Sequence, residues 1–457
     1  MKVGERIELT FESLALGGEA VARTADGMVI FVRGGVPGDR GLVQITKRKK
    51  QFAAGKIVEL LASSPLRIAP RCEYFGRCGG CKWQYLAYPD QLRFKQQQVV
   101  ETLEHLGQLP NVPVNPIIGM ETPWYYRNKM EFTFGVDDAA GLILGQHFPD
   151  RWDLLLDLQT CYLQSEKSVE IFALCREFAR KHALSVFSSE TSAGLLRHAV
   201  VREGKHTGDL MVNLVTSGEY FPELDRFVRY LLTAEPHLTS LILTINRRKG
   251  QTSQGQEEHL LFGEPTITET LNGFAYEISA KSFFQTNTVQ AERLYQTVQR
   301  MAAGNTAGTA VDLYCGTGAI AFHLAAQFDQ VYGVELVPEA VLNAQQNAAR
   351  NNIPNVSFHC GEAQKVLPTV LATPPDLIVV DPPRAGLSDK VIRQILNAAP
   401  RQLIYVSCNP ATLARDLALF MAGGYAVAEV QPLDMFPHTY HIETIVNLRS
   451  LAHESHE

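Results

Sequence analysis

Three short apolar runs in the C-terminal half of the chain each end in residues that can do chemistry. The run at 310–311 leads into a Gly-rich turn, the run at 377–380 into Asp381, and the run at 403–406 into Cys408. Short apolar runs bounded by turn residues predict buried strands. In open α/β sheets, ligands bind just beyond the carboxyl ends of the strands. A cysteine in that position beside a Gly-rich turn indicates covalent catalysis on a bound substrate.

The Gly-rich turn has the features of a nucleoside site. Gly316 and Gly318 follow a predicted strand and precede a predicted helix, so the backbone can approach a ligand closely. Glu335 ends the next predicted strand, where an acidic side chain can accept hydrogen bonds from ribose hydroxyls. Ala319 follows Gly318, without the third glycine of a dinucleotide fingerprint or a P-loop lysine. These features favour a nucleoside cofactor without a pyrophosphate, with S-adenosylmethionine as the leading candidate; the competing interpretation is a tight structural turn.

Asp381 is followed by two prolines and then by Arg384. The prolines stiffen the loop and hold the preceding carboxylate in place. In methyltransferases that act on amino nitrogens, a similar Pro-Pro pair is followed by an aromatic residue that stacks on the base. Arg384 stands in that place here, which argues against chemistry on an amino nitrogen.

Cys408 and Glu443 together suit methylation at a ring carbon. C5 of uracil is not nucleophilic until a group adds to C6, and a thiolate can add there. The resulting enolate can attack a sulfonium methyl group at C5, after which a base must remove the C5 proton so that the cysteine can leave. Glu443 follows aromatic and histidine residues and precedes an apolar run. The competing interpretation of Cys408 is a small buried apolar residue.

Three more cysteines lie close together in the first hundred residues. Five residues separate Cys72 from Cys78 and two separate Cys78 from Cys81, and three thiols need a fourth ligand. Cys161 is the nearest candidate, with Cys175 in reserve. Four thiolates suit Zn²⁺ or an iron–sulfur cluster. The spacing differs from that of radical S-adenosylmethionine enzymes, which disfavours reductive cleavage of the cofactor.

The elements that position these residues divide the chain into three parts. Residues 1–61 alternate β-like runs with glycine turns and carry a basic cluster at 47–50, which predicts a small β-barrel whose basic loop contacts nucleic-acid phosphates. Residues 62–270 hold the cysteine loop, a helical stretch and a strand-rich region with hairpin breaks such as 137–141. From 271 to 457, strands alternate with helices, which predicts βαβ units and a parallel sheet. Helices are expected at 287–302, 338–351, 388–398 and 410–422.

Composition and charge indicate a globular chain with a polyanionic partner. Of the 457 residues, 46% are hydrophobic and 20% are charged. The net charge of −6 is uneven, because residues 1–100 carry +7 and the remainder carries −13. The chain has no apolar run long enough to cross a membrane, and its start lacks the pattern of a signal peptide. The expectation is a cytoplasmic monomer that does not associate with membranes.

Four longer motifs, in their order along the chain, resemble those of the bacterial RNA uracil-5-methyltransferases, in particular the iron–sulfur branch that methylates 23S ribosomal RNA. The motifs lie at 17–23, 281–287, 407–416 and 437–443. The first resembles the signature of the TRAM domain, an OB-like RNA-binding barrel. The last two match the motifs that carry the family's nucleophile and general base. The resemblance therefore implies these roles for Cys408 and Glu443.

The resemblance also implies a fold, a cofactor and a cluster. The expected fold is α/β: a Rossmann-like class I methyltransferase domain at 271–457, a TRAM barrel at 1–61, and a central iron–sulfur α+β domain at 62–270. A helical segment at about 91–117 would pack with the catalytic domain. Asp381 would hydrogen-bond the uracil or help to position the cofactor. The expected contacts of S-adenosylmethionine are Gln285, Tyr314, Gly316, Gly318, Ala319, Glu335, Glu362 and Asp381. The implied ligands of a [4Fe–4S] cluster are Cys72, Cys78, Cys81 and Cys161.

These expectations describe an enzyme that methylates C5 of a uridine in structured RNA, with 23S ribosomal RNA as the first substrate choice and tRNA as the second. The cluster is expected to be structural or RNA-shaping, because the reaction transfers no electrons. Two alternatives stay open. An amino-group nucleic-acid methyltransferase built on Asp381 would keep its activity in Cys408→Ala. A non-catalytic iron–sulfur RNA-binding or assembly protein would bind RNA without transferring a methyl group.

Overall fold

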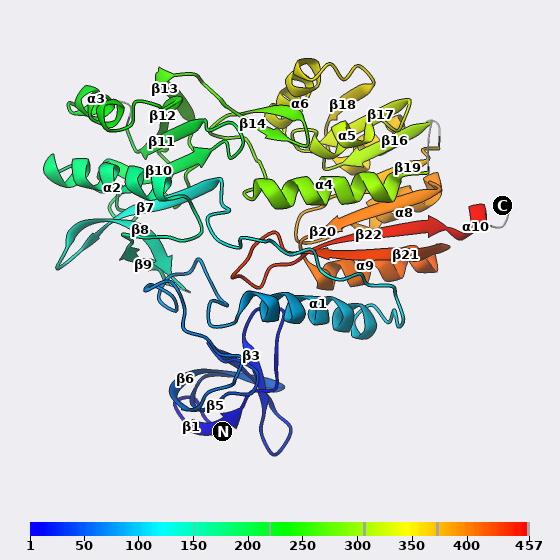
Figure 1. The fold of residues 1–457 in the computed structure, drawn as a ribbon, viewed down its shortest axis with the longest axis horizontal. Helices are drawn as coiled ribbons and strands as arrows, with labels where there is room; N and C mark the ends of the chain where they lie inside the picture. Colours follow the sequence, from blue (N-terminus) through cyan, green and yellow to red (C-terminus); the bar gives the residue numbers. More distant parts are fainter. Residues whose placement is uncertain (150, 219–220, 305–307, 372–373, 455–457) are drawn as a thin grey trace.

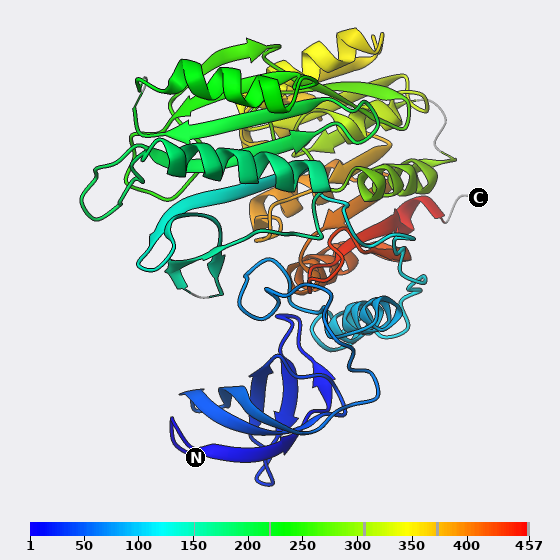
Figure 2. The same cartoon turned by 60° about the vertical axis from the view of Figure 1, so that its left-hand side comes forward.

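Three large β-sheets and one two-stranded hairpin follow one another along the chain in the computed structural model (Figure 1). The structure describes residues 1–149, 151–218, 221–304, 308–371 and 374–454. The first sheet forms a separate lobe at one end of the molecule, while the second and third lie side by side at the other end (Figures 1 and 2).

The first sheet curls into a small barrel, with strand order β1-β5-β6-β4-β3-β2. Phe11, Ile30 and Val43 fill its interior. Gly35 is required beside them, because a Cβ there would lie 2.6 Å from the ring of Phe11. The basic cluster at 47–50 is exposed between the two longest strands. The strands are β1 (Arg6–Thr10), β2 (Ser13–Leu14), β3 (Ala20–Arg23), β4 (Val29–Arg33), β5 (Arg40–Arg48) and β6 (Phe52–Ala62).

A long helix, α1 (Tyr88–His105), connects the barrel to the rest of the molecule (Figure 1). It buries Val99 and Leu103, four positions apart and therefore on one face, in the core of the C-terminal sheet. The predicted helical segment at about 91–117 is wrong in its second half. Residues 107–118 include Gly107 and three prolines, which cannot continue a helix. They run extended instead, with isolated bridges between Val114 and Val430 and between Ile118 and Leu433.

The second sheet has the strand order β13-β12-β11-β10-β7-β8-β9, and two helices cover one of its faces (Figure 2). Phe132 of the sheet stacks on Phe172 of the longer helix, with ring centroids 4.1 Å apart. The predicted break at 137–141 is the hairpin between β7 and β8. The elements are β7 (Lys129–Asp137), β8 (Gly141–Phe148), β9 (Arg151–Asp157), α2 (Glu166–Lys181), β10 (Leu196–Glu203), β11 (Leu210–Thr216), α3 (Leu224–Ala234), β12 (Ser240–Ile245) and β13 (Glu257–Gly263).

The C-terminal part alternates strands and helices, as predicted, after a hairpin of β14 (Ile267–Leu271) and β15 (Phe274–Ile278). All four predicted helices are present, and each begins and ends within one residue of its expected limits. The strands are β16 (Thr309–Leu313), β17 (Gln330–Glu335), β18 (Val356–Cys360), β19 (Leu377–Val380), β20 (Gln402–Ser407), β21 (Tyr425–Leu433) and β22 (Glu443–Ser450). The helices are α4 (Thr288–Ala302), α5 (Ala319–Leu324), α6 (Pro338–Arg350), α7 (Ala363–Val370), α8 (Asp389–Ala398), α9 (Pro410–Ala422) and α10 (Leu451–Glu454).

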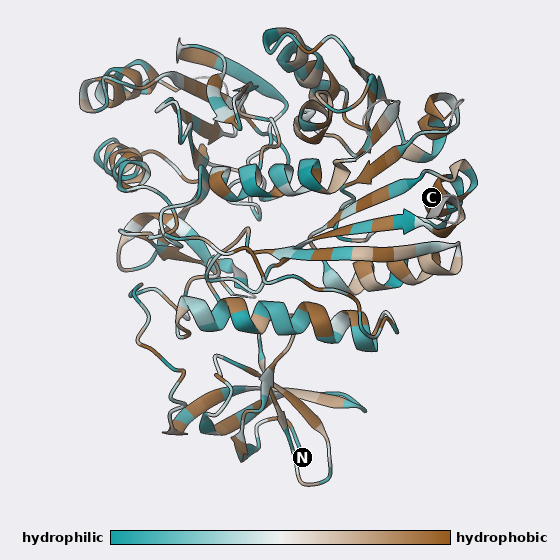
Figure 3. Cartoon of the chain, turned by 45° about the vertical axis from the view of Figure 1, so that its right-hand side comes forward, coloured by the Kyte–Doolittle hydropathy of each residue, from teal (hydrophilic) through white to brown (hydrophobic). Residues whose placement is uncertain are grey.

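The sheet order in this part is β18-β17-β16-β19-β20-β22-β21, with the first five strands parallel and β22 antiparallel to β20. All residues of β19 and β20 are buried, as expected for central strands covered on both faces. Figure 3 shows these strands as mainly hydrophobic. Among the described residues, no helix combines the length and the apolar character needed to cross a membrane.

Candidate active site

The carboxyl ends of β16, β19 and β20 lie next to one another, because these strands are parallel neighbours. They bring the Gly-rich turn, Asp381 and Cys408 to one edge of the sheet. β22 runs in the opposite direction, with Ser407 paired to Thr444, so Glu443 at its start lies at the same edge. The sheet order reverses between β16 and β19, and such switch points are where ligands bind in open α/β folds.

Left-handed backbone angles and hydrogen bonds to Glu335 fix the conformation of the Gly-rich turn. Gly318 has φ +88° and precedes the first turn of α5, and a Cβ there would lie 2.8 Å from the ring of Phe358. Glu335, at the end of β17, accepts hydrogen bonds from the backbone nitrogens of Gly316 at 3.1 Å and of Val337 at 2.9 Å. Tyr314 also has a left-handed backbone, with φ +66°. Ala319 is buried at the start of α5. These residues surround the start of α5 at the end of a parallel strand, which is where nucleoside ligands bind in such folds.

Two carboxyl groups lie under this turn. Asp312 is fully buried within β16, and its Oδ2 accepts a hydrogen bond from the backbone nitrogen of Ala321 at 3.0 Å. Its Oδ1 has no protein partner, and burial together with the nearby Asp381 raises its pKa well above the usual range. Burial also raises the pKa of Asp381, to about 7. Sequence reasoning did not single out Asp312, although an acidic residue inside an apolar run was a visible signal.

The loop after Asp381 is tied to the segment that holds Cys408. The carbonyl oxygen of Arg384 accepts hydrogen bonds from the side chains of Asn409, at 3.0 Å, and Thr412, at 3.2 Å. The Arg384 guanidinium lies 3.3 Å from Nδ1 of His441. Arg384, whose place after the two prolines argues against amino-nitrogen chemistry, therefore also supplies a positive charge at the site.

Cys408 lies between β20 and α9 and is half-buried. Asn409 caps α9, because its Oδ1 accepts a hydrogen bond from the backbone nitrogen of Ala411 at 3.1 Å. Burial raises the pKa of the Cys408 thiol to about 11; the charges of Glu443 and Asp381 act in the same direction. A thiol in this setting stays protonated until a positive charge is added or a negative charge is removed.

Glu443 is 6% exposed at the start of β22. Burial and the nearby Asp381 raise its pKa well above the usual range, whereas Arg384 and Lys95 act in the opposite direction. Lys95 comes from α1, 348 positions earlier in the chain by the numbering of the two residues. A carboxylate with a raised pKa is a stronger base once it is ionised, which suits a general base.

Two predicted cofactor residues lie further from this group. The carboxylate of Glu362 precedes α7, is exposed, and contacts Lys365 and Gln364, which lower its pKa. Gln285 lies in the loop before α4, and its backbone oxygen accepts a hydrogen bond from Asn128 of the central sheet at 2.8 Å. The structure thus places Gln285 at a junction between domains and Glu362 at the outer end of the sheet edge.

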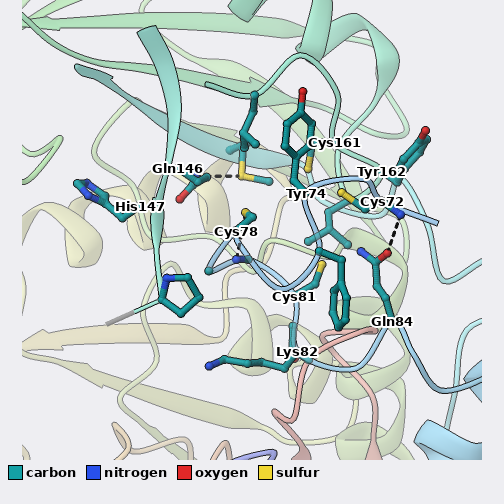
Figure 4. Close-up of a pocket in the computed structure, with 18 of the residues that line it drawn as sticks. Cys72, Tyr74, Cys78, Cys81, Lys82, Gln84, Gln146, His147, Cys161 and Tyr162 are labelled. Atoms are coloured by element: carbon teal, nitrogen blue, oxygen red, sulfur yellow. Dashed lines mark hydrogen bonds between the residues drawn. The ribbon is translucent and has the colours of Figure 1, made fainter. Parts of the chain in front are cut away.

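Four cysteines line a cavity with a volume of about 520 Å³, between the cysteine loop and the central sheet. Figure 4 shows the sulfur atoms of Cys72, Cys78, Cys81 and Cys161 turned toward a common space. All four are free thiols. Cys175, the reserve ligand in the sequence interpretation, is instead buried in the core beneath α2. The structure therefore brings together the first four and leaves Cys175 outside.

Burial holds the thiols of this cavity in their neutral form. Burial raises the pKa of Cys78 to about 11 and of Cys81 to about 12, so bare thiolates would be unstable there. Within the described part of the chain, no group of three or more His, Cys, Asp or Glu side chains is placed to hold one metal ion.

Comparisons with known proteins agree with the geometry of the sheet edge. Residues 305–434 match the family described as methyltransferase domain, residues 241–366 match tRNA (uracil-5-)-methyltransferase, and residues 1–58 match the TRAM domain. The fold and the Gly-rich turn, together with these matches, define a class I S-adenosylmethionine-dependent methyltransferase with an N-terminal TRAM domain.

Relatives place the chain more closely. It is 40% identical to an uncharacterised RNA methyltransferase of Halalkalibacterium halodurans, over 97% of this chain and 96% of that protein. It is 41% identical to an uncharacterised RNA methyltransferase of Porphyromonas gingivalis, over 95% of this chain and 98% of that protein. The structure of the tRNA (uracil-54, C5)-methyltransferase of Pyrococcus abyssi, solved with S-adenosyl-L-homocysteine, superposes with a TM-score of 0.78 and 28% identity, over 97% of this chain and all of that one. The chain belongs to the RNA uracil-5-methyltransferase family.

Proposed function

We propose that this protein transfers a methyl group from S-adenosylmethionine to C5 of a specific uridine in 23S ribosomal RNA, through a covalent bond between Cys408 and C6. The observation that carries the proposal is the shared sheet edge. Cys408 and Glu443 end and begin two adjacent strands there, next to the cofactor turn. Nucleophile, base and methyl donor must meet at one pyrimidine ring, and this edge is where they can do so.

Each bond change can be assigned to a group at this edge. The Cys408 thiolate adds to C6, and the electrons of the C5–C6 double bond move to form an enolate. C5 then takes the methyl group as the bond from sulfonium to methyl breaks, which leaves S-adenosylhomocysteine. The Glu443 carboxylate removes the proton from C5. The C5–C6 double bond re-forms, and Cys408 leaves as a thiolate.

The charges at the site determine when these steps can occur. Carboxylates at Asp381 and Glu443 hold the proton on Cys408, whereas Arg384 opposes them. Bound S-adenosylmethionine supplies an electrophilic methyl group on a positively charged sulfur. Its charge favours ionisation of both Cys408 and Glu443, because a nearby positive charge stabilises an anion. Asp381 is proposed to hydrogen-bond the uracil or to position the cofactor.

The cofactor contacts are assigned to the residues around the Gly-rich turn. Glu335 ends β17, where ribose hydroxyls would be bound, while the open backbone at Gly316 and Gly318 allows close approach. The remaining proposed contacts of S-adenosylmethionine are Gln285, Tyr314, Ala319, Glu362 and Asp381.

A [4Fe–4S] cluster held by Cys72, Cys78, Cys81 and Cys161 is the second part of the proposal. The common cavity and the four free thiols that line it support this part of the proposal. Transfer of a methyl group from a sulfonium to C5 requires no electron transfer. The cluster would therefore fix the shape of the 62–87 loop against the central sheet.

RNA would lie across the barrel, the central sheet and the catalytic edge. The exposed basic cluster at 47–50 suits phosphate contacts. The target uridine must leave its stack before C6 can reach Cys408, at a cost of a few kcal/mol that RNA contacts offset. The Pyrococcus relative acts on tRNA by its name, so tRNA is the competing substrate. We place the protein in the cytoplasm, as a monomer, where either RNA is available.

RNA containing 5-fluorouridine at the target position tests the covalent route. A base can remove a proton from C5 but not a fluorine, so Cys408 cannot leave and the methylated complex should be trapped. It should migrate as a protein–RNA adduct on a denaturing gel. Cys408→Ala should form none. Mapping 5-methyluridine in 23S ribosomal RNA and tRNA, from cells with and without this gene, identifies the substrate. The covalent proposal is refuted by rapid methylation of uridine in the alanine variant.

A further inference from the structure

Three side chains on one face of α1 bind the loop that leads into Glu443. Tyr88, Gln91 and Lys95 are three and four positions apart, which places them on the same side of the helix. The loop at 434–442 connects β21 to β22 and ends immediately before Glu443. All three side chains form hydrogen bonds to this loop, so α1 contributes to the catalytic edge from outside the catalytic domain.

Lys95 and Asp434 form an ion pair in the interior. Lys95 Nζ lies 2.6 Å from Asp434 Oδ1, and neither side chain has any exposed surface. Lys95 also donates to the carbonyl oxygen of Phe436 at 3.2 Å. Tyr88 donates from its hydroxyl to the other oxygen of Asp434 at 2.9 Å. One lysine therefore binds both a side chain and the backbone of the 434–442 loop.

Gln91 binds the strained residue of the same loop. His438 has φ +65°, a left-handed conformation that costs energy for a residue with a side chain. Its backbone nitrogen donates to Gln91 Oε1 at 2.9 Å, and its Nδ1 lies 3.1 Å from Gln91 Nε2. Its ring stacks on Trp124, with centroids 3.7 Å apart. Such a conformation persists only where the surroundings over-determine it, and it concentrates at functional sites.

Two further elements hold the loop. The backbone nitrogens of Lys82 and Trp83, just after Cys81, donate to the carbonyl oxygen of His438 at 2.9 and 3.1 Å. From α4, Gln290 donates to the carbonyl oxygen of Asp434 at 2.8 Å. The 434–442 loop is thus fixed by α1, by the cysteine loop and by α4.

We infer that Lys95, with Gln91, is a positioning residue for the C5-proton removal step, because it fixes the 434–442 loop and places a buried positive charge near Glu443. This inference rests on the proposed role of Glu443 as the base. It goes further by assigning part of that function to a helix outside the catalytic domain. Lys95 acts through Glu443 and need not touch the substrate.

Burial lowers the pKa of Lys95, whereas the carboxylates of Asp434 and Glu443 act in the opposite direction and favour its charged form. The groups that act on Glu443 are Asp381, which raises its pKa, and Arg384 and Lys95, which lower it. The charge of Glu443 in turn raises the pKa of the buried hydroxyl of Tyr295 on α4 and the pKa of the Cys408 thiol. Removing the positive charge of Lys95 should therefore raise the pKa of Glu443 and shift the proton-removal step to higher pH.

A purely structural ion pair is the competing interpretation. Buried ion pairs often contribute little net stability, and replacing both partners can be neutral, whereas removing one leaves an uncompensated charge. The double variant Lys95→Met/Asp434→Asn separates the two interpretations. It removes both charges and keeps an acceptor for Tyr88, so folding should be preserved while the electrostatic and positioning effects are lost.

The test uses the full chain and RNA that the wild-type protein methylates, with protium or deuterium at C5 of the target uridine. In single-turnover reactions, both Lys95→Met and the double variant should form the methylated covalent complex at close to the wild-type rate. Release of product should slow by at least ~10-fold, a part of the ~10²–10⁴-fold that general base catalysis contributes. A primary deuterium effect on release should appear, and the pH profile of release should move upward.

Controls make each outcome decisive. Arg300→Met breaks an ion pair with Glu429 between α4 and β21 and should behave as wild type. Gln91→Met tests the loop contact without changing a charge, and it should raise the deuterium effect without moving the pH profile. If the Lys95 variants slow complex formation and release equally, with no deuterium effect, the inference is wrong. If Glu443→Gln itself accumulates no covalent complex, it is the assignment of Glu443 that is wrong.

Discussion

Tyr405 donates a hydrogen bond from its hydroxyl to Oδ2 of Asp416 at 2.7 Å, in the interior of the catalytic domain. The same oxygen accepts a second hydrogen bond, from the backbone nitrogen of Leu387 at 2.8 Å, and Asp416 is fully buried. Tyr405 lies on the strand that ends before Cys408, and Leu387 follows the loop that begins at Asp381. One carboxylate on α9 therefore fixes two parts of the active site relative to each other.

Asp416→Ala should destabilise the domain and slow the chemistry together. The change leaves two buried donors without an acceptor, and each such donor costs about 1–3 kcal/mol. We expect the free energy of unfolding to fall by about 2–6 kcal/mol and the 5-fluorouridine adduct to form more slowly. Denaturant unfolding and gel analysis measure the two effects. Asp416→Asn keeps a carbonyl oxygen and should lose less; equal losses in both variants would contradict the argument.

Glu443→Gln should stop the reaction after methyl transfer. The amide cannot accept the C5 proton, so Cys408 cannot leave, and a methylated covalent RNA complex should accumulate. Turnover should fall by about 10²-fold or more, in the range that general bases contribute. A labelled methyl group on the protein-bound RNA band is the readout. Glu429→Gln on β21 serves as the control, and turnover of the Glu443 variant at the wild-type rate would exclude the assigned role.

The rate should rise with pH where the carboxyl groups at the site ionise. Glu443 works as a base only when ionised, and burial and the charge of Asp381 raise its pKa. Burial raises the pKa of Asp381 to about 7, so its carboxyl group is mostly ionised only when the pH is above that value. Asp381→Asn removes it, so the pKa of Glu443 should fall and the rise of the single-turnover rate should move to lower pH. A profile that stays in place, or moves upward, would contradict this electrostatic account.

Cys78→Ser should lose the iron that the four-cysteine cavity is proposed to hold. Iron and sulfide analysis, with the visible absorbance of protein purified without oxygen, measures the loss. Cys175→Ser changes a thiol that lies outside the cavity and should retain the metal content of the wild type. If the wild-type protein contains zinc and no iron, the cluster proposal is wrong and the four thiolates bind Zn²⁺ instead.

Gly318→Ala should weaken binding of S-adenosylmethionine beyond its effect on stability. Gly318 and Gly273 share a left-handed φ of +88°, which costs about 1–2 kcal/mol for other residues. A Cβ on Gly318 would also lie 2.8 Å from Phe358, whereas a Cβ on Gly273 would meet no atom within 4 Å. Calorimetric titration should therefore show weaker binding for Gly318→Ala and unchanged binding for Gly273→Ala. Equal affinities in the two variants would argue against a cofactor role of the turn.

Local patterns predicted the elements that carry the active site. Four helices were predicted to within one residue, because apolar spacing and capping residues are local features. The strand ends before Asp381 and Cys408 followed from buried apolar runs. The helical segment at about 91–117 was implied by resemblance, and it does not extend through 107–118 because Gly107 and three prolines cannot continue a helix.

Long-range pairings could not be predicted in the same way. Lys95 looks like an ordinary helix residue in the sequence, and nothing near it indicates that its partner is Asp434. The strain at His438 likewise depends on contacts with Gln91 and Trp124 from distant segments. The sharing of one cavity by Cys161 and the three N-terminal cysteines was implied by resemblance, because spacing alone left Cys175 as an alternative.

The distance in sequence between Lys95 and Asp434, 339 positions, has a consequence for how the molecule is made. As the chain emerges from the ribosome, α1 appears long before the strand and loop that contact it. Contacts between such remote segments form slowly because a long loop must close first. A nascent chain is therefore expected to carry a finished barrel long before it has a working catalytic edge, so binding of RNA can precede any ability to modify it.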